Sequence, residues 1–266
     1  MRHLTALSFL VVLVLVLGLG CQAAKNSPAQ ADAALKQASP VAGASQIVLV
    51  TAEDWNTNQA RLRRFERSGP NAAWHPVGDA VPVTLGRNGL AWGRGLHGEG
   101  LSNAPVKKEG DGRAPAGVFS LPRAFIGPNE SVSASPHFPV HQVTAQTVCV
   151  DTVASQHYNQ MFEENAVAKD WDSDERMLRP DGLYRYGLFV DHNAPSVQPG
   201  AGSCIFLHLW RGPGSPTAGC TAMAEADMLA VLRWLDATKN PVLVQLPREE
   251  LVRLAPAWGA PELAAK

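Results

Sequence analysis

Short β-like runs separated by turn residues are the feature that most restricts the fold of this chain. The 266 residues include 23 glycines and 20 prolines, a share that favours many turns between short strands over a bundle of long helices. Apolar and alternating runs predict strands over residues 47–51, 61–66, 81–85, 117–121, 148–150, 187–191, 203–210 and 242–246. The sequence therefore predicts a mainly β fold.

Helical periodicity is convincing in one segment, residues 224–237. Met228, Val231 and Leu235 recur there at spacings of three and four, and two acidic residues stand in the first turn, where they complement the helix dipole. A second short helix is expected over residues 247–254. The fold class is thus mainly β with one or two helices.

Composition and charge bound the domain count and the partners. Residues 46–253 contain no internal repeat, charge block or composition break. This uniformity predicts a single domain over these residues, followed by a C-terminal tail over residues 254–266. Lys and Arg number 23 against 24 Asp and Glu, for a net charge of −1. Such a balanced chain lacks the basic surface that nucleic-acid binding requires, so no nucleic-acid partner is expected.

The amino terminus has the pattern of an export signal. A basic residue precedes a long apolar run within residues 1–20, and small residues then lead to Cys21. That ending resembles the lipobox of bacterial lipoproteins, whose cysteine is lipidated, although Gly18 stands where the motif usually has leucine. An Ala/Gln/Pro-rich tether is expected over residues 21–45. The alternative is an uncleaved membrane anchor.

Three cysteines remain in the predicted domain. Cys149 and Cys204 lie in apolar surroundings, so each could be a buried small hydrophobe, or the two could pair in an oxidising compartment. Three is an odd number, so at least one thiol is free or joined to another chain. Cys220 differs from the others, because it lies between a Gly/Pro-rich loop and the predicted helix.

A nucleophilic thiol needs a base, since an unperturbed cysteine is mostly protonated at neutral pH. His208 ends the run over residues 203–210, and the loop that follows can fold back to bring Cys220 near it. Gly219 would let the backbone approach a substrate carbonyl, with amides near 219 and 220 as oxyanion donors. Without further signal, both His208 and Cys220 could equally be core residues.

Two separated motifs resemble those of the L,D-transpeptidase catalytic domain family, also called the YkuD domain. Phe-Leu-His-Leu-Trp at residues 206–210, followed by Thr-Ala-Gly-Cys-Thr-Ala-Met at 217–223, is similar to the signature around that family's cysteine. Gly-Asp-Gly-Arg-Ala-Pro-Ala-Gly-Val-Phe at 110–119 resembles an upstream stretch of the family. The resemblance covers residues 80–246.

This resemblance implies a mixed β-sandwich and an enzyme of the bacterial cell wall. In the family, a cysteine attacks the carbonyl between a diamino acid and D-alanine in a peptidoglycan stem peptide, and an amine of a neighbouring stem resolves the thioester. Cys220 would be the nucleophile and His208 the base. No cofactor or metal is implied. The expected location is the cell envelope, as a membrane-anchored lipoprotein facing the periplasm.

The resemblance also suggests where substrate would bind, with departures. Thr217, Gly219, Trp210 and Arg211 are the candidate substrate-binding or oxyanion residues. Many members have a histidine and an arginine where this chain has two alanines, at 218 and 222, and Arg211 is a candidate substitute for that arginine. A hydrolase that uses the same Cys-His pair, acting as a carboxypeptidase or endopeptidase, and a non-catalytic peptidoglycan-binding lipoprotein remain alternatives.

Two further patterns do not predict sites. Residues 93–98 match the glycine spacing of a dinucleotide-binding loop, but no helical pattern follows, so no nucleotide partner is expected. His137 and His141 have the spacing of a helical metal pair, but prolines at 136 and 139 disfavour a helix there.

Overall fold

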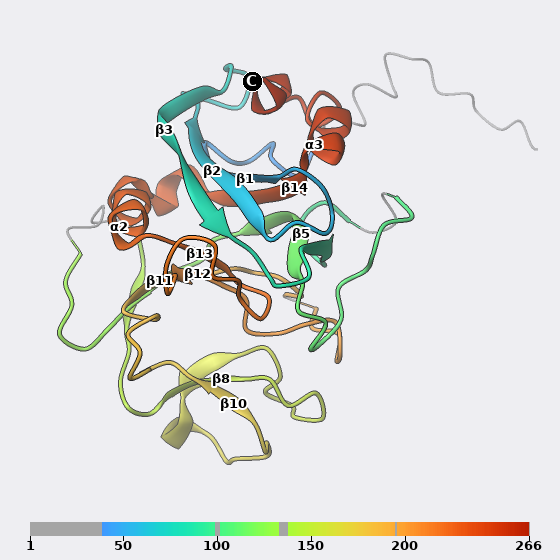
Figure 1. The fold of residues 1–266 in the computed structure, drawn as a ribbon. Helices are drawn as coiled ribbons and strands as arrows, with labels where there is room; N and C mark the ends of the chain where they lie inside the picture. Colours follow the sequence, from blue (N-terminus) through green and yellow to red (C-terminus); the bar gives the residue numbers. More distant parts are fainter. Residues whose placement is uncertain (1–38, 99–101, 133–137, 195, 266) are drawn as a thin grey trace, which may run out of the picture.

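A computed structural model of the chain describes residues 39–98, 102–132, 138–194 and 196–265 (Figure 1). The predicted export signal, the lipidation site Cys21 and most of the predicted tether lie outside the described residues. None of the described helices is long and apolar enough to cross a lipid bilayer.

Strands dominate the described chain, as the turn-rich sequence predicts. The larger sheet has 11 strands, in the spatial order β4 (Leu90–Trp92), β5 (Ala114–Ser120), β14 (Val242–Pro247), β1 (Gln46–Ala52), β2 (Gln59–Glu66), β3 (His75–Thr84), β13 (Thr221–Met223), β12 (Phe206–Leu209), β11 (Tyr186–Phe189), β6 (Ala124–Ile126) and β7 (Val140–Gln142). A second sheet has three strands, in the order β10 (Asp174–Arg176), β8 (Thr147–Val150) and β9 (Met161–Glu163).

The larger sheet is mixed. The pairs β1/β14, β4/β5, β6/β7 and β12/β13 are parallel, and the other pairs are antiparallel. Parallel neighbours need a connection that crosses over, and the β12/β13 connection is the loop that carries the end of the His208 strand to Cys220. The two main residues of the candidate site, His208 and Cys220, lie at the two ends of this connection.

Two α-helices and three short 3₁₀ turns complete the described elements: α2 (Glu225–Trp234), α3 (Arg248–Leu254), η1 (Glu164–Ala166), η2 (Ala237–Lys239) and η3 (Pro261–Ala264). Helix α2 buries Met228, Val231 and Leu232, the face that the predicted spacing defines. Its N-cap residue Ala224 makes no side-chain cap hydrogen bond, so packing of the apolar face is the main support of this helix.

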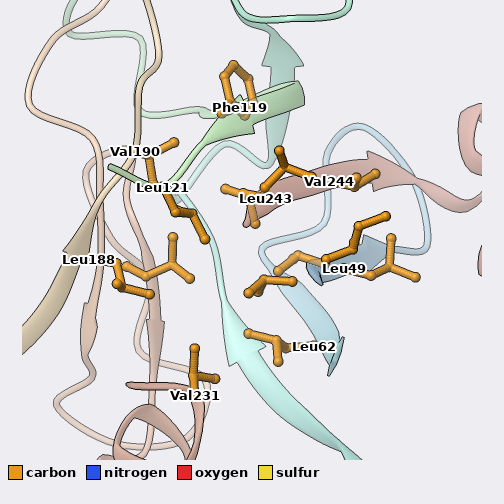
Figure 2. Packing of buried hydrophobic residues seen from close by; sticks show 14 of the residues in the cluster. Leu49, Leu62, Phe119, Leu121, Leu188, Val190, Val231, Leu243 and Val244 are labelled. Carbon is orange, nitrogen blue, oxygen red and sulfur yellow. The ribbon is translucent and has the colours of Figure 1, made fainter. Parts of the chain in front are cut away.

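The sheet folds over so that its two halves enclose one core. Leu49 on β1, Phe119 on β5 and Leu243 on β14 belong to the same buried cluster as Leu188 on β11 and Val231 on α2, and Figure 2 shows these side chains converging from both sides. The prediction of a mainly β sandwich with one or two helices is confirmed.

The ordered structure extends beyond the predicted domain limits of 46 and 253. Val41 is 1% exposed and Leu263 is 1% exposed, and both belong to the main core. The buried Arg67 guanidinium donates hydrogen bonds to the carbonyls of Val41 and Ala44, which ties the segment before β1 to the sheet. The predicted tail after residue 253 therefore packs as part of the fold.

One predicted strand is shorter in the structure, and one strand near the site was not predicted. The run over residues 203–210 forms a strand only at Phe206–Leu209, because Cys204 takes a left-handed backbone with φ of +53°, which no strand accommodates. Strand β13 separates Cys220 from α2. The loop and helix expected on either side of Cys220 are thus joined by a short strand.

Candidate active site

Strand pairing brings His208 and Cys220 to one face of the sheet. His208 on β12 pairs with Ala222 on the parallel strand β13. Paired residues share a face and side chains alternate along a strand, so Cys220, two positions before Ala222, projects to the same side as His208. The loop between the two strands therefore folds back so that both side chains line the same cavity.

Both groups line a cavity of about 250 Å³. Its walls come from the β12/β13 loop, from the segment between β10 and β11, and from the two strands themselves. The lining residues are Glu175, Arg179, Leu183, Tyr184, His208, Leu209, Trp210, Arg211, Ser215, Pro216, Thr217, Ala218, Cys220 and Ala222. Of the residues singled out from sequence, only Gly219 and the undescribed Cys21 are not among them.

The His208 imidazole is buried and has a defined tautomer. Its Nδ1 lies 2.7 Å from the backbone carbonyl of Leu209, and because a carbonyl can only accept, Nδ1 carries the hydrogen and Nε2 has a free lone pair. Burial lowers the pKa of His208 to about 4. The ring also packs edge-on against Tyr184, with centroids 5.0 Å apart. The neutral imidazole can accept a proton at Nε2.

The carbonyl of Leu209 is the group that orients the His208 imidazole. No feature of the sequence identifies this carbonyl. A backbone carbonyl has no residue signature, so only the conformation of the chain could reveal this hydrogen bond.

The Cys220 thiol is buried and protonated. It is 8% exposed, its Sγ accepts a hydrogen bond from the Phe206 amide at 3.4 Å, and its S–H points to the Cys204 carbonyl at 3.6 Å. Burial raises the pKa of Cys220 to about 12. The cavity therefore holds a neutral thiol and a neutral imidazole, and such a thiol can act as a nucleophile only if a base removes its proton.

Thr217 shapes the turn that carries the thiol. Its hydroxyl donates to the Cys220 carbonyl at 2.6 Å and accepts from the Gly219 amide at 3.1 Å. The Gly219 amide is thus already engaged, and a Cβ at this position would lie 3.2 Å from the Arg113 carbonyl. The oxyanion role expected for Gly219 stays a prediction, and it requires this amide to exchange its partner.

A charged cluster borders the cavity. The Arg179 guanidinium binds Asp181 with two hydrogen bonds, at 2.9 and 2.6 Å, and Arg211 contacts the same carboxylate at 3.2 Å. Arg179 also lies over the ring of Tyr184, 5.0 Å from its centroid. These interactions lower the pKa of Asp181 to about 2. Arg211 was predicted at the site, whereas Arg179 was missed because it lies far upstream of the motif.

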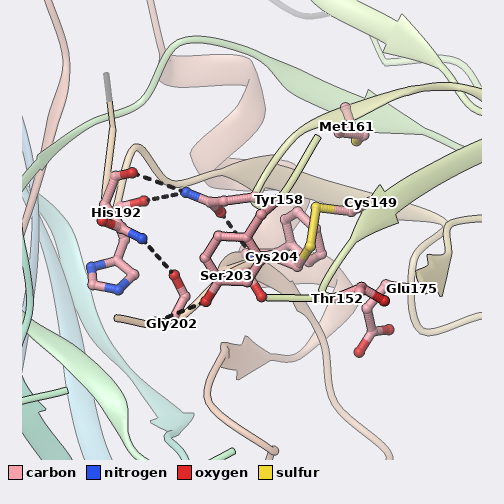
Figure 3. Close-up of a disulfide and its surroundings, with 12 residues drawn as sticks. Cys149, Thr152, Tyr158, Met161, Glu175, His192, Gly202, Ser203 and Cys204 are labelled. Carbon is pink, nitrogen blue, oxygen red and sulfur yellow. Dashed lines mark hydrogen bonds between the residues drawn. A yellow bond between two sulfur atoms is a disulfide. The ribbon is translucent and has the colours of Figure 1, made fainter. Parts of the chain in front are cut away.

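A disulfide joins Cys149 to Cys204, whose Cα atoms are 5.9 Å apart (Figure 3). The structure thereby settles the pairing that sequence left open and leaves Cys220 as the free cysteine among the described residues. The Cys204 amide donates to Asn159 at 3.0 Å. The disulfide and Asn159 together hold Cys204 in the left-handed conformation that directs its carbonyl toward the Cys220 thiol.

Tyr158 supports the same segment from the other side. Its hydroxyl hydrogen-bonds to Glu109 and accepts the Gly202 amide at 3.1 Å, and Ser203 donates to Glu109 at 2.7 Å. Figure 3 shows Tyr158, Gly202 and Ser203 around the chain that leads to Cys204. Tyr158 therefore stabilises the chain segment that leads to the disulfide, and it does not line the cavity of Cys220.

The other patterns in the sequence have structural explanations. A Cβ at Gly93 or Gly95 would lie within 3 Å of the Phe119 ring, so this loop needs glycine for close packing, and no helix opens in its described part. His141 contacts Glu163 at 3.2 Å, and His137 is not described. Within the described ranges, no three His, Cys, Asp or Glu residues are grouped as metal ligands would be.

Comparison with known families identifies one match. The model of the L,D-transpeptidase catalytic domain family matches residues 54–244, a range that begins before β2 and ends within β14, and that includes both His208 and Cys220. No curated protein and no solved structure matches the chain.

Proposed function

Because this chain belongs to the L,D-transpeptidase catalytic domain family, we propose that it transfers acyl groups between peptidoglycan stem peptides through a thioester on Cys220. The observation that carries this proposal is the pairing of a free thiol with an imidazole of defined tautomer in one cavity. Neither group needs a cofactor for this chemistry.

The first half of the reaction forms the thioester. Nε2 of His208 takes the thiol proton as the Cys220 sulfur attacks the carbonyl carbon between the diamino acid and D-alanine. The C–N bond of the resulting tetrahedral intermediate breaks, His208 returns the proton to the leaving amine, and D-alanine departs. The pKa of His208, about 4, supports this role because the imidazole is unprotonated at neutral pH.

The second half regenerates the thiol. An amine of a neighbouring stem peptide attacks the thioester carbonyl and gives a proton to Nε2 of His208. A new amide C–N bond forms, the C–S bond breaks, and the proton passes from His208 to the Cys220 sulfur. The amide of Phe206, which donates to this sulfur at 3.4 Å, stabilises the negative charge that develops on it.

The charged cluster beside the cavity supports recognition of a carboxylate. Arg179 pairs with Asp181 and lies 3.8 Å from Glu175, whereas Arg211 contacts Asp181 alone and its side chain is 64% exposed. A carboxylate of the stem peptide can bind the accessible guanidinium of Arg211 in the geometry that guanidinium favours. Ala222, which occupies the family's usual arginine position, lines the cavity without charge.

We also propose that the protein works in the cell envelope, exported by residues 1–20 and held to a membrane by a lipid on Cys21. The support is the sequence pattern together with the substrate, because peptidoglycan lies outside the cytoplasmic membrane. The disulfide between Cys149 and Cys204 is also typical of an oxidising compartment.

Acylation by a carbapenem tests the proposed nucleophile. The family resemblance implies that such a β-lactam forms an adduct on Cys220, so the intact mass should rise for the wild type and remain unchanged for Cys220→Ala. His208→Ala should slow adduct formation by about 10²- to 10⁴-fold, the usual contribution of a general base. Folded wild-type protein that takes no adduct would contradict the proposal and favour a non-catalytic binding protein.

Incubation with tetrapeptide muropeptides separates transfer from hydrolysis. We expect dimers linked between two diamino acids, detected by mass spectrometry. If the products are shortened monomers alone, the same Cys-His pair serves a hydrolase.

A further inference from the structure

A groove of about 750 Å³ lies outside the candidate active site. Its floor is one face of β1, β2 and β3, where Arg61 on β2 lies between Thr51 on β1 and Pro82 on β3. One wall is formed by α3 and the C-terminal residues, which Figure 1 shows beside these strands. The groove is the space between this face of the three strands and the wall formed by α3 and the C-terminal residues.

The opposite wall of the groove is the β12/β13 loop. Pro213 and Gly214 line the groove, Ser215 and Thr217 line the cavity of Cys220, and Trp210 lines both. A ligand that lies in the groove therefore ends one side chain away from the cavity that holds the thiol. This continuity connects the groove to the reaction.

The described lining of the groove carries more positive than negative charge. Arg61, Arg63 and Arg248 line it, against a single carboxylate, that of Glu53. Arg61 donates to the Ala80 carbonyl, and Arg63 donates to a carbonyl at the C-terminus. Among the ion pairs of the described ranges, none involves these three arginines.

The spacing of two of these arginines suits a ligand with several carboxylates. Arg61 and Arg63 are two positions apart on β2, so their side chains lie on the same face of the strand. Their Cα atoms are about 7 Å apart at the usual rise per residue of a strand. Guanidinium groups bind carboxylates through paired hydrogen bonds. Apolar side chains such as Leu49 and Leu251 complete the lining, as is usual in ligand sites.

We propose that this groove binds the acceptor stem peptide, with its carboxylates on Arg61 and Arg63 and its amine directed past Trp210 to the thioester on Cys220. The inference rests on the proposed function, since only a transferase uses an acceptor amine. It assigns the donor to the cavity of Cys220 and the acceptor to the arginine-lined groove, so the two stems approach from different sides of the β12/β13 loop.

A tripeptide stem that ends at the diamino acid is the probe for this site. It lacks the D-alanine that leaves during acylation, so it can act only as an acceptor, and its binding to the full chain can be measured by calorimetry. Arg61→Gln with Arg63→Gln should weaken tripeptide binding at least fivefold in 0.1 M salt. Arg61→Lys with Arg63→Lys should recover part of the affinity, because the charge is retained while the paired hydrogen bonds are lost.

The matched control removes two positive charges elsewhere. Lys108 and Arg233 are exposed and line neither the groove nor the cavity of Cys220. Lys108→Gln with Arg233→Gln should bind the tripeptide within twofold of the wild type. An equal loss in this control would overturn the proposal, because the effect would then come from net charge alone.

Two further outcomes keep this inference separate from the proposed function. If carbapenem acylates wild-type Cys220 but the Arg61 and Arg63 substitutions leave tripeptide affinity unchanged, the groove assignment is wrong and the proposed function stands. If no adduct forms on the wild type, the proposed function itself fails. If the Arg61→Gln, Arg63→Gln variant loses binding to phosphatidylglycerol vesicles but binds the tripeptide as the wild type does, the groove is a lipid site and the acceptor assignment is overturned.

Discussion

At the scale of single residues, the Cys220 thiol and the His208 imidazole are both uncharged over a wide pH range. Burial raises the pKa of the thiol to about 12 and lowers that of the imidazole to about 4. An ion pair of thiolate and imidazolium would require the opposite order of these pKa values. In the proposed mechanism the thiol proton is therefore transferred as substrate is attacked, and the buried sulfur is protected from side reactions until then.

The alkylation rate of Cys220 tests this resting state. Because only the thiolate reacts, the folded protein should react with iodoacetamide at pH 7.5 at least about 100-fold more slowly than the urea-unfolded chain, whose thiol has an ordinary pKa of about 8.5. The rate should keep rising above pH 9. A plateau between pH 5 and pH 8 would show a preformed thiolate and contradict this account.

At the scale of elements, a three-residue strand holds Cys220, the proposed nucleophile, in position. Strand β13 pairs with β12 on one side and β3 on the other. On its opposite face, the Thr221 hydroxyl donates to Gln245 at 2.7 Å, and Gln245 in turn donates to the Pro115 carbonyl at 2.8 Å. Cys220 thus sits at the start of a strand whose position is set by four other strands.

The disulfide is a second anchor, and its removal should affect both stability and Cys220. Replacing Cys149 and Cys204 by serine opens a loop of 55 residues, which should lower the free energy of unfolding by about 4 kcal/mol on the chain-entropy estimate. Urea denaturation measures this loss. Alkylation of Cys220 should become faster, since its carbonyl partner at Cys204 is no longer held.

The control for this prediction is Cys220→Ser, which keeps the disulfide and should retain most of the stability. If the double serine variant shows a wild-type alkylation rate at Cys220 while folded, the disulfide stabilises the fold without positioning the thiol.

At the scale of the whole molecule, two buried histidines link folding to pH. Burial lowers the pKa of His208 to about 4 and that of His192 to about 3, whereas both titrate near 6.5 in the unfolded chain. Between pH 6.5 and 4 the unfolded state therefore binds more protons, so acid favours unfolding. Burial raises the pKa values of Glu175 and Asp191, which offsets part of this effect in the most acidic part of the range.

The free energy of unfolding should accordingly be highest at neutral pH and fall from pH 6.5 toward pH 4.5. The slope should approach about 1.4 kcal/mol per pH unit for each buried histidine, measured by urea titration at several pH values. His192→Gln should reduce the slope, whereas substitution of the exposed His75 should leave it unchanged. A flat profile over this range would show that the imidazoles take up protons in the folded state.

Local signals were sufficient for the main elements and led to the prediction of His208 and Cys220 as a reactive pair. Apolar runs identified the cores of β1 and β14, and alternating residues identified β2, because burial on one or both faces of a strand is visible in consecutive residues. The spacing of Met228 and Val231 identified α2 for the same reason. Motifs that flank His208 and Cys220 named the pair, since both residues lie within one short connection.

Contacts between distant segments were not predictable in this way. The partner of Cys149, the carbonyl that orients His208 and the position of Arg179 beside the cavity all depend on how separate strands pack. Strand β13 was missed because three residues are too few for a periodic signal, and the hydrogen bond from Thr221 to Gln245 is invisible in either local sequence.

The sequence by itself thus determined the fold class and the main strands and helices, and it predicted Cys220 and His208 as the reactive pair, because alternation and motif spacing act between near neighbours in the chain. Only the tertiary structure decided the disulfide, the neutral state of Cys220 and His208, and the arginine-lined groove, because burial and charge at each of these depend on segments that meet only after the sheet has closed.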